Sequence, residues 1–415
     1  MDVAEHIQLK LVHEIHTSGR RAFRSCRRSW NWTFNEQYYP LTTAKPLEFG
    51  SAYHKGMEVY YDPETWDWDP EVKAARAILA FEEMCLAQKA KALDEGVTLD
   101  PDVEEDYAER VELGKGMLRY YFKEIAPKED IGWIPVKVEI GFMVPIPNPE
   151  TGEEAIWCRC MQCWGRWTTR NSEWHPGMPL DGLTPEDLPA DYAEWRGLPV
   201  VYAGRLDLLA MDEYGNYYII DWKTAARLME STEFLNLDDQ IASYCWALWT
   251  LGIPVRGFIY HEQRKAYPIP PKRNKNRYMG KMYSASKQEP YEYELYKRTV
   301  EEGDPEGYAN GAYDEFLHHL KYEGTTFFKR TPVIKSPQEL KNIEENIGQE
   351  ALDMIDPGLR IYPSPGKFKC DFCVFQQPCT EKNSGGDFQF ALDTMYEQRE
   401  AYYVRNEPST DKVDR

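Results

Sequence analysis

The chain has 415 residues, and its 49 basic and 69 acidic residues give a net charge of −20 at neutral pH. Apolar residues make up 42% and aromatic residues 14%, enough for a sizeable core, which excludes a wholly disordered chain. No apolar run of about 18 residues is present, so we expect no membrane span. The N-terminal residues lack a signal-peptide pattern, so we expect a cytoplasmic protein. Because the whole chain is acidic, contact with nucleic acid requires local basic patches.

Helical periodicity predicts four helices in the first third of the chain. They cover 18–39, a basic and aromatic segment with Ser18 as its N-cap, followed by 47–61, 70–95 and 102–126. Alternating apolar and polar residues over 136–142 predict a strand. Residues 147–199 are rich in Pro, Gly, Trp and acidic residues, and we expect an irregular insertion there.

The middle of the chain changes to the period of strands. Two β-rich runs, 200–211 and 217–223, predict a hairpin. After it the sequence predicts a helix over 237–251, a strand over 253–262, a loop over 271–288 with six Lys or Arg and no acidic residue, and helices over 289–322 and 337–354. The expected regions are a helical region 1–130, an α/β core 131–262 that holds the insertion, a basic loop and helical segment 263–336, a C-terminal segment 337–404 and a disordered tail 405–415.

The hairpin carries a group of charges beside apolar neighbours. Asp207 is on its first strand, and Asp221 and Lys223 share one face of the second because strand side chains alternate. Charges in such a place are costly unless they are paired or bound to a metal. Two carboxylates with a lysine suit magnesium and an activated water, and the lysine suits charge developing on a phosphoryl group. A structural ion pair across the hairpin explains the same residues.

Two helices carry further candidates. Gln240 and Tyr244 lie four residues apart, on one helix face. His54 lies on a helix face with Glu58 and is a candidate metal ligand or acid–base group. Each of these also has an ordinary explanation, as a polar helix face or as a packed histidine.

Six of the nine cysteines fall in two clusters. Cys370, Cys373 and Cys379 have the spacing C-x2-C-x5-C, which needs a distant fourth ligand, such as Cys26, to hold zinc or a four-iron cluster. The other cluster, Cys158, Cys160 and Cys163 with His175 downstream, is either a second zinc site or a set of structural cysteines in a strand-like run.

Taken together, these motifs resemble the RecB-like branch of the PD-(D/E)XK nuclease superfamily. The matches, in chain order, are the Ser18–Trp32 segment with Cys26, Gly50 with His54, Gly204 with Asp207, Asp221 with Lys223 and Thr224, Gln240 with Tyr244, and the three C-terminal cysteines. Each motif is weak alone, and their order is specific. The chain is similar to CRISPR-associated exonucleases and the AddB nuclease domain, and relatives that stand alone are frequent in bacteriophages.

The resemblance implies a fold, cofactors and site residues. The fold is an α/β restriction-endonuclease-like core with a mixed sheet flanked by helices. His54, Asp207 and Asp221 are implied as ligands of Mg²⁺ or Mn²⁺, and Lys223 as the catalytic lysine. Gln240 and Tyr244 are expected near the active site, and Glu139 is a further candidate carboxylate. Cys26, Cys370, Cys373 and Cys379 are implied as ligands of a 4Fe-4S cluster.

The implied activity is metal-dependent exonucleolytic cleavage of DNA ends or single strands in recombination, replication or repair. Eight basic residues are expected to contact DNA phosphates: Arg20, Arg21, Arg24, Arg27, Lys272, Arg273, Lys275 and Arg277. Recombination or replication proteins are the partners implied. The alternatives are a non-catalytic DNA-end-binding or CRISPR-adaptation scaffold with the same fold, and a zinc protein that binds a partner through the insertion.

Overall fold

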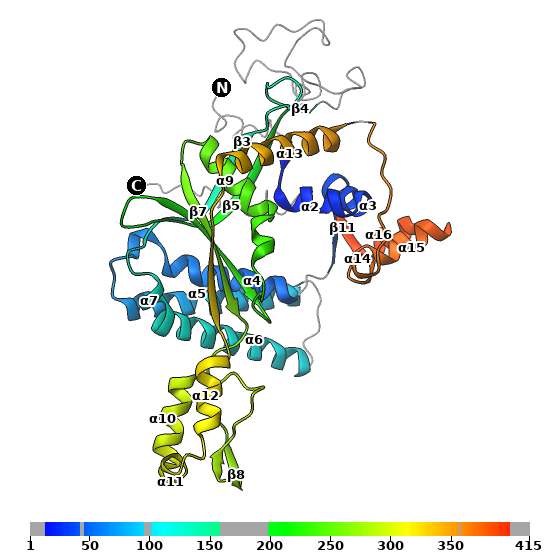
Figure 1. The fold of residues 1–415 in the computed structure, drawn as a ribbon. Coiled ribbons are helices and arrows are strands. Elements are labelled where there is room, and N and C mark those ends of the chain that lie inside the picture. The colour runs from blue at the N-terminus through cyan, green and yellow to red at the C-terminus, as the bar shows by residue number, and fades with distance from the viewer. Residues whose placement is uncertain (1–12, 42–44, 95–100, 158–197, 357, 399–415) are drawn as a thin grey trace, which may run out of the picture.

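A computed structural model describes residues 13–41, 45–94, 101–157, 198–356 and 358–398. A mixed sheet with helices on both faces forms its centre, which confirms the expected fold class (Figure 1). Seven strands of the described chain make up this sheet: β1 (His13–Ile15), β3 (Ile134–Pro145), β4 (Ile156–Trp157), β5 (Leu198–Met211), β6 (Tyr217–Ala225), β7 (Val255–Arg264) and β10 (Phe328–Val333). The predicted strand over 136–142 and the predicted hairpin are β3 and the β5–β6 pair.

The long strand β5 organises the sheet. It pairs antiparallel with β3 along most of its length, parallel with β1 near its start, and antiparallel with β6 only at its end. The β5–β6 ladder stops at Leu208 and Ile220, beyond which β6 continues in parallel with β7 as far as Ala225. The two strands therefore part at this point, and we call it the fork.

Two groups of helices cover the sheet. One face packs against α4 (Lys45–Tyr60), α5 (Pro70–Asp94) and α6 (Pro101–Tyr120), which lie near the predicted helices 47–61, 70–95 and 102–126. The other face packs against α9 (Asp239–Thr250) and α13 (Pro337–Ile355). Because side chains alternate along a strand, β6 contributes to the apolar core on each face of the sheet. Ile220 and Trp222 lie in the core beneath α4, α5 and α6, and Ile219 lies in the core beneath α9 and α13. None of the helices in the described parts of the chain combines the length and apolarity needed to cross a bilayer.

The predicted N-terminal helix is broken into pieces. The structure has α2 (Thr17–Ser25), α3 (Arg27–Trp30) and a π-helical turn over Asn31–Asn35. Cys26 between α2 and α3 is extended, with φ −160° and ψ 109°, and His16 is the N-cap of α2 in place of Ser18. The break gives Cys26 a position that a continuous helix would not provide.

The two ends of the described chain pack together. Strand β2 (Tyr38–Pro40) pairs antiparallel with β11 (Tyr396–Gln398). Trp32 packs against Phe375, with ring centroids 5.4 Å apart, in a small core of its own. The remaining helices at this end are α14 (Lys367–Asp371), α15 (Gln376–Ser384) and α16 (Phe388–Met395). Figure 1 shows them beside α2 and α3, so the N- and C-terminal segments form one unit.

The basic stretch 271–288 is a hairpin, and the prediction of a loop there is wrong. Its strands are β8 (Arg273–Tyr278) and β9 (Lys281–Tyr283). They pack with α10 (Tyr293–Gly303), α11 (Pro305–Ala309) and α12 (Asp314–Glu323) around a separate, mainly aromatic core. This unit projects from the sheet and its covering helices in Figure 1. The chain then returns through β10, which pairs with β7.

The two ends of the predicted insertion pair with each other at the edge of the sheet. Ile156 lies opposite Pro199, and Trp157 opposite Leu198, so the chain leaves and re-enters at one place. Residues 158–197, which hold the cluster of Cys158, Cys160 and Cys163 together with His175, lie outside the described residues.

Candidate active site

Asp207 and Asp221 meet at the fork. Continuing the register of Leu208 opposite Ile220 places Asp207 across from Asp221. The carboxylate of Asp207, rather than a backbone carbonyl, accepts the N–H of Trp222 at 2.7 Å. A side chain thus occupies the place where the ladder would have continued, and the Asp207 carboxylate lies close enough to Asp221 to raise the pKa of that carboxyl.

His54 approaches the fork from α4. Its Nε2 lies 2.6 Å from the carbonyl oxygen of Trp222, and its Nδ1 lies 3.5 Å from Oδ1 of Asp207. A carbonyl only accepts, so Nε2 carries the proton. In the neutral ring, Nδ1 then presents its lone pair toward Asp207, which is the arrangement of a metal-binding imidazole.

Glu139 completes a group of three possible ligands. The pairs Val138–Leu208 and Ile140–Leu206 place it opposite Asp207 on the neighbouring strand. One ligand atom from each of His54, Glu139 and Asp207 lies within 4.8 Å of the other two. The backbone of Glu139 has a φ of 48°, a left-handed conformation that is uncommon outside glycine.

The negative charge at this group is high. Burial and the nearby Asp207 and Glu58 carboxylates raise the pKa of Glu139 to about 7, against the lowering effect of His54 and Arg205. One imidazole and several crowded carboxylates suit a divalent cation, because its charge offsets their repulsion. The residues present therefore fit Mg²⁺ or Mn²⁺.

Arg205 is a residue that the sequence analysis missed. Its guanidinium lies 3.7 Å from the Glu139 carboxylate and is partly exposed. The signal was available, since Arg205 precedes Asp207 by two positions and alternation places both on one face of β5.

Asp221 and Lys223 form a close pair, as their shared strand face predicts. Nζ of Lys223 lies 2.6 Å from Oδ2 of Asp221, which is only 4% exposed. Burial raises the pKa of Asp221, while the lysine charge lowers it. Burial lowers the pKa of Lys223, but Asp221 and Asp207 outweigh this and raise it to about 12. The lysine is therefore a cation at neutral pH.

Helix α9 brings one of its two candidates to this pair. Nε2 of Gln240 donates to Oδ1 of Asp221 at 3.2 Å. Asp238 caps the helix by accepting the backbone N–H groups of Gln240 and Ile241, which fixes Gln240 in the first turn. Tyr244, one turn later, is buried and packs edge-to-face against Phe142.

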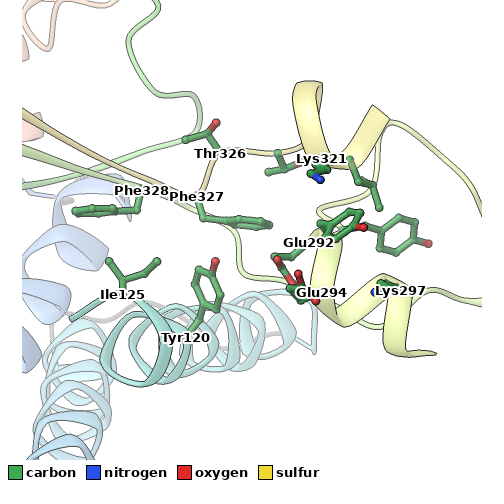
Figure 2. Close-up of a pocket in the computed structure, with 13 residues that line it drawn as sticks. Tyr120, Ile125, Glu292, Glu294, Lys297, Lys321, Thr326, Phe327 and Phe328 are labelled. Carbon is green, nitrogen blue, oxygen red and sulfur yellow. The ribbon is translucent and has the colours of Figure 1, made fainter. Parts of the chain in front are cut away.

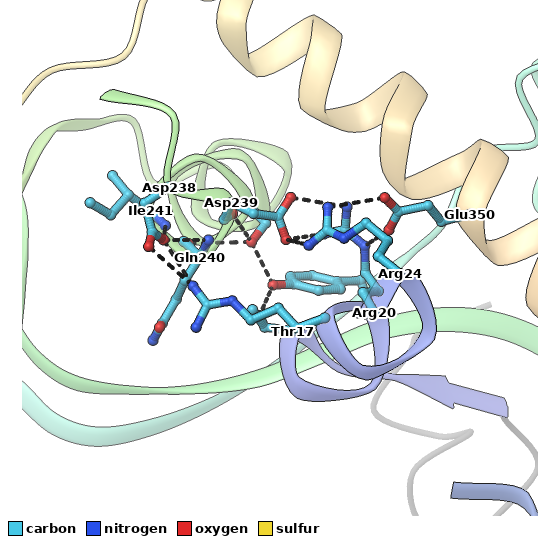
Figure 3. Close-up of polar contacts among 11 residues, drawn as sticks. Thr17, Arg20, Arg24, Asp238, Asp239, Gln240, Ile241 and Glu350 are labelled. Atoms are coloured by element: carbon cyan, nitrogen blue, oxygen red, sulfur yellow. Dashed lines mark hydrogen bonds and ion pairs between the residues drawn. The ribbon is translucent and has the colours of Figure 1, made fainter. Parts of the chain in front are cut away.

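The arginines of α2 mostly make structural ion pairs (Figure 3). Arg20 is fully buried between Asp239 of α9 and Glu350 of α13, with contacts of 3.1 and 2.6 Å. Its predicted contact with DNA is therefore wrong, because no ligand reaches it. Arg24 joins the same two carboxylates at its exposed edge, and Arg21 pairs with Asp238.

The remaining basic candidates are on the surface. The Arg27 guanidinium stacks over Phe23 and Tyr362. Lys272 and Arg273 begin the hairpin, which also carries Lys275 and Arg277, and all four are exposed.

The four cysteines at the chain ends are drawn into one region. The backbone N–H of Ser364 donates to Sγ of Cys26, and Arg28 donates to Sγ of Cys379, both at 3.4 Å. Burial raises the pKa of Cys373, and the nearby Cys26 and Cys370 thiols raise it further, against hydrogen bonds that lower it. No three of these four described sulfur atoms lie within 4.8 Å of one another.

A separate cavity of about 620 Å³ lies where the hairpin unit joins the core (Figure 2). Tyr120 of α6, Phe327, and Glu292 and Glu294 near the start of α10 contribute to its lining. Lys297 and Lys321 line it as well, and it contains none of the candidate ligands, so it is not the candidate active site.

A comparison with protein-family models gives a match over most of the chain. The family model of the PD-(D/E)XK nuclease superfamily matches residues 17–380, which include Asp207, Asp221 and Lys223. A comparison with curated proteins found no match. Because the family match covers most of the chain, the protein belongs to the PD-(D/E)XK nuclease superfamily, which implies a metal-dependent nuclease with DNA as its substrate.

Proposed function

We propose that this protein is a metal-dependent DNA exonuclease that hydrolyses phosphodiester bonds at DNA ends or in single strands. The observation that carries the proposal is the convergence at the fork: His54, Glu139 and Asp207 meet as possible ligands beside the Asp221–Lys223 pair. The similarity of the sequence motifs to RecB-like exonucleases, including phage members, supports a role in recombination, replication or repair.

His54, Glu139 and Asp207 would hold a divalent cation, with Asp221 as a further carboxylate. A bound cation lowers the pKa of a coordinated water and stabilises charge on a phosphoryl oxygen. The backbone of Trp222 orients two of these ligands, because its N–H binds Asp207 and its carbonyl binds His54. The protein thus holds both side chains in place before substrate binds.

Lys223 supplies a fixed positive charge beside the ligands. Its partner Asp221 and the neighbouring Asp207 keep it protonated, so it donates hydrogen bonds to an attacking water or to the phosphate as negative charge develops. Gln240 holds Oδ1 of Asp221 and so restricts the rotation of the carboxylate. Arg205, at the exposed edge of the group, is placed to bind the phosphate that is cleaved.

We also propose that Cys26, Cys370, Cys373 and Cys379 hold a 4Fe-4S cluster. Supporting this, the two chain ends pack together, and Cys26, Cys370 and Cys373 are close enough to affect one pKa. The C-x2-C-x5-C spacing, together with a distant Cys26, supplies the four thiolates that such a cluster needs.

The test is cleavage of end-labelled DNA with Mg²⁺ or Mn²⁺, using linear single strands, linear duplexes and closed circles of both kinds. We expect linear DNA to be shortened from its ends and circles to remain intact. The Asp221→Asn variant is the matched control and should be inactive. Cleavage of the circles would make the protein an endonuclease, and a wild type that binds DNA ends without cleaving them would support the scaffold alternative.

A further inference from the structure

The β8–β9 hairpin lies in a basic segment of a chain that is acidic overall. Residues 271–288 hold six Lys or Arg and no acidic residue, in a chain of net charge −20. Two of these cations have partners, as Lys272 pairs with Glu289 and Arg277 with Asp304. Among the residues that the structure describes, Arg273, Lys275 and Lys281 form no ion pair, so their charge is available to a ligand.

The hairpin is held rigidly to the unit that carries it. The buried carboxylate of Asp304 accepts from Arg277 on β8, at 2.8 Å, and from the backbone N–H of Met282 on β9. Tyr313 donates to the same carboxylate and accepts the N–H of Met282. Both strands are therefore anchored to the helices behind them, and the hairpin forms a fixed arm.

The tip of this arm presents large apolar side chains to solvent. Tyr278 is 71% exposed and Met279 is 78% exposed. Met279 and Gly280 form a tight two-residue turn, with φ values of 48° and 79°. Such turns favour Asn-Gly because both central residues have positive φ. Methionine is therefore unfavourable here for two reasons: its backbone is in the left-handed region, and its apolar side chain is exposed to solvent. A residue that costs stability in two ways points to a function at the tip.

We propose that the β8–β9 hairpin is a DNA-binding arm that recognises the end of a duplex. Arg273, Lys275 and Lys281 contact backbone phosphates, while Tyr278 and Met279 pack against the terminal base pair, whose face is exposed only at an end. Aromatic side chains stack on bases without sequence preference, and lysine and arginine bind phosphates. The arm would bind the DNA at a place separate from the candidate active site at the fork.

This inference rests on the proposed nuclease function for its choice of ligand. The charge of the arm suits any polyanion, and the exposed Tyr278 and Met279 at its tip suit the flat face of a terminal base pair. Duplex DNA presents both features together, because its phosphates flank an exposed base pair at each end. A protein partner is therefore the alternative that the experiment must exclude.

The first experiment measures binding of the full chain to a labelled blunt duplex in EDTA, where cleavage cannot occur. The double variant Arg273→Gln with Lys275→Gln should bind about tenfold more weakly, and the slope of log affinity against log salt should fall by about 2. The matched control removes two exposed lysines elsewhere, Lys128→Gln on α7 (Ala126–Glu129) and Lys341→Gln on α13, and should bind as the wild type does.

The second experiment tests the tip with duplexes that carry 2-aminopurine at the terminal or at a central base pair. Wild-type protein should change the fluorescence of the terminal probe and leave the central one unchanged. The variant Tyr278→Ser with Met279→Asn creates an Asn-Gly turn, which keeps the hairpin folded. This variant should not change the fluorescence of the terminal probe, and its affinity for the duplex should be lower by roughly fivefold or more. Tyr214→Ser, at the equally exposed turn between β5 and β6, is the control.

Three results would overturn the proposal. One is wild-type affinity in the Arg273 and Lys275 double variant, and another is an unchanged terminal signal in the tip variant. The third is wild-type binding to poly-glutamate that needs Lys275, with no binding to DNA, which would make the partner a protein. All of these readouts measure binding in EDTA and do not depend on cleavage. A protein that binds DNA through the arm in EDTA but does not cleave DNA with Mg²⁺ or Mn²⁺ would refute the nuclease proposal and leave the proposal of the arm intact.

Discussion

Nε2 of His54 donates a hydrogen bond to the carbonyl oxygen of Trp222, 2.6 Å away. The same residue's N–H binds Asp207, so one buried tryptophan in the middle of β6 orients a candidate ligand on α4 and another on β5. The Trp222 side chain lies in the core between the sheet and α4, which explains why its backbone is fixed well enough for this task. One residue thus fixes the positions of side chains from α4 and β5 relative to β6.

His54→Ala should weaken metal binding more than DNA binding. The variant removes the lone pair on Nδ1, and we expect at least about a tenfold loss in Mn²⁺ affinity, comparable to the loss of a ligand-orienting group. Isothermal titration of Mn²⁺ and DNA anisotropy in EDTA measure the two effects separately. His318→Ala, at an exposed position on α12, is the control. Unchanged Mn²⁺ affinity would make His54 a packed histidine.

Asp221→Asn and Lys223→Met should each lower the cleavage rate by about 10²-fold or more, since each removes a charge that acts on the reacting phosphate or its cation. Both substitutions keep the side-chain volume similar, so the fold should survive. Single-turnover cleavage measures the rate, and circular dichroism checks the fold. Full activity in either variant would refute the catalytic assignment of the pair.

Arg20→Met should destabilise the protein without weakening DNA binding. The arginine is fully buried, and its loss leaves Asp239 and Glu350 with only the more exposed Arg24 between them, which should cost about 3 kcal/mol, the lower end for breaking a buried pair. Arg21→Met removes an exposed pair with Asp238 and should cost about 1 kcal/mol or less. Urea unfolding compares the two. If both variants lost the same free energy of unfolding, the burial of Arg20 would not explain the contribution of its ion pairs to stability.

Residues whose role depends on a local pattern were predictable from the sequence. Asp221 and Lys223 share a strand face because the period of a strand is two, and α4 and α9 followed from helical periodicity. The helix break at Cys26 was not predictable, because the surrounding residues favour a helix. Nor was the burial of Arg20, since its partners Asp239 and Glu350 are brought to it only by the folded sheet.

Strands that pair with segments distant in sequence could not be predicted either. The short strands β1, β2, β10 and β11 are stabilised by neighbours distant in sequence and carry too few residues for a periodic signal. The left-handed backbone of Glu139 is likewise a tertiary effect, which the alternation of β3 does not reveal. The local rules therefore found β6 and the helices α4 and α9. The meeting of the chain ends was expected from the cysteine motif alone, and the pairing of β2 with β11 was not predicted.

The last prediction concerns the chain ends. Cys26→Ser, Cys370→Ser, Cys373→Ser and Cys379→Ser should each lose iron and acid-labile sulfide, while the buried Cys85→Ser and Cys245→Ser should keep both. A covalent bridge that closes so long a loop stabilises by about 4–5 kcal/mol in the chain-entropy model, so the first four variants should also melt at lower temperature. A Cys158, Cys160 and Cys163 triple variant should keep its iron. If Cys26→Ser retains the full cluster and the triple variant loses it, the fourth ligand comes from the insertion, and the packing of β2 on β11 stabilises the chain ends without a shared metal centre.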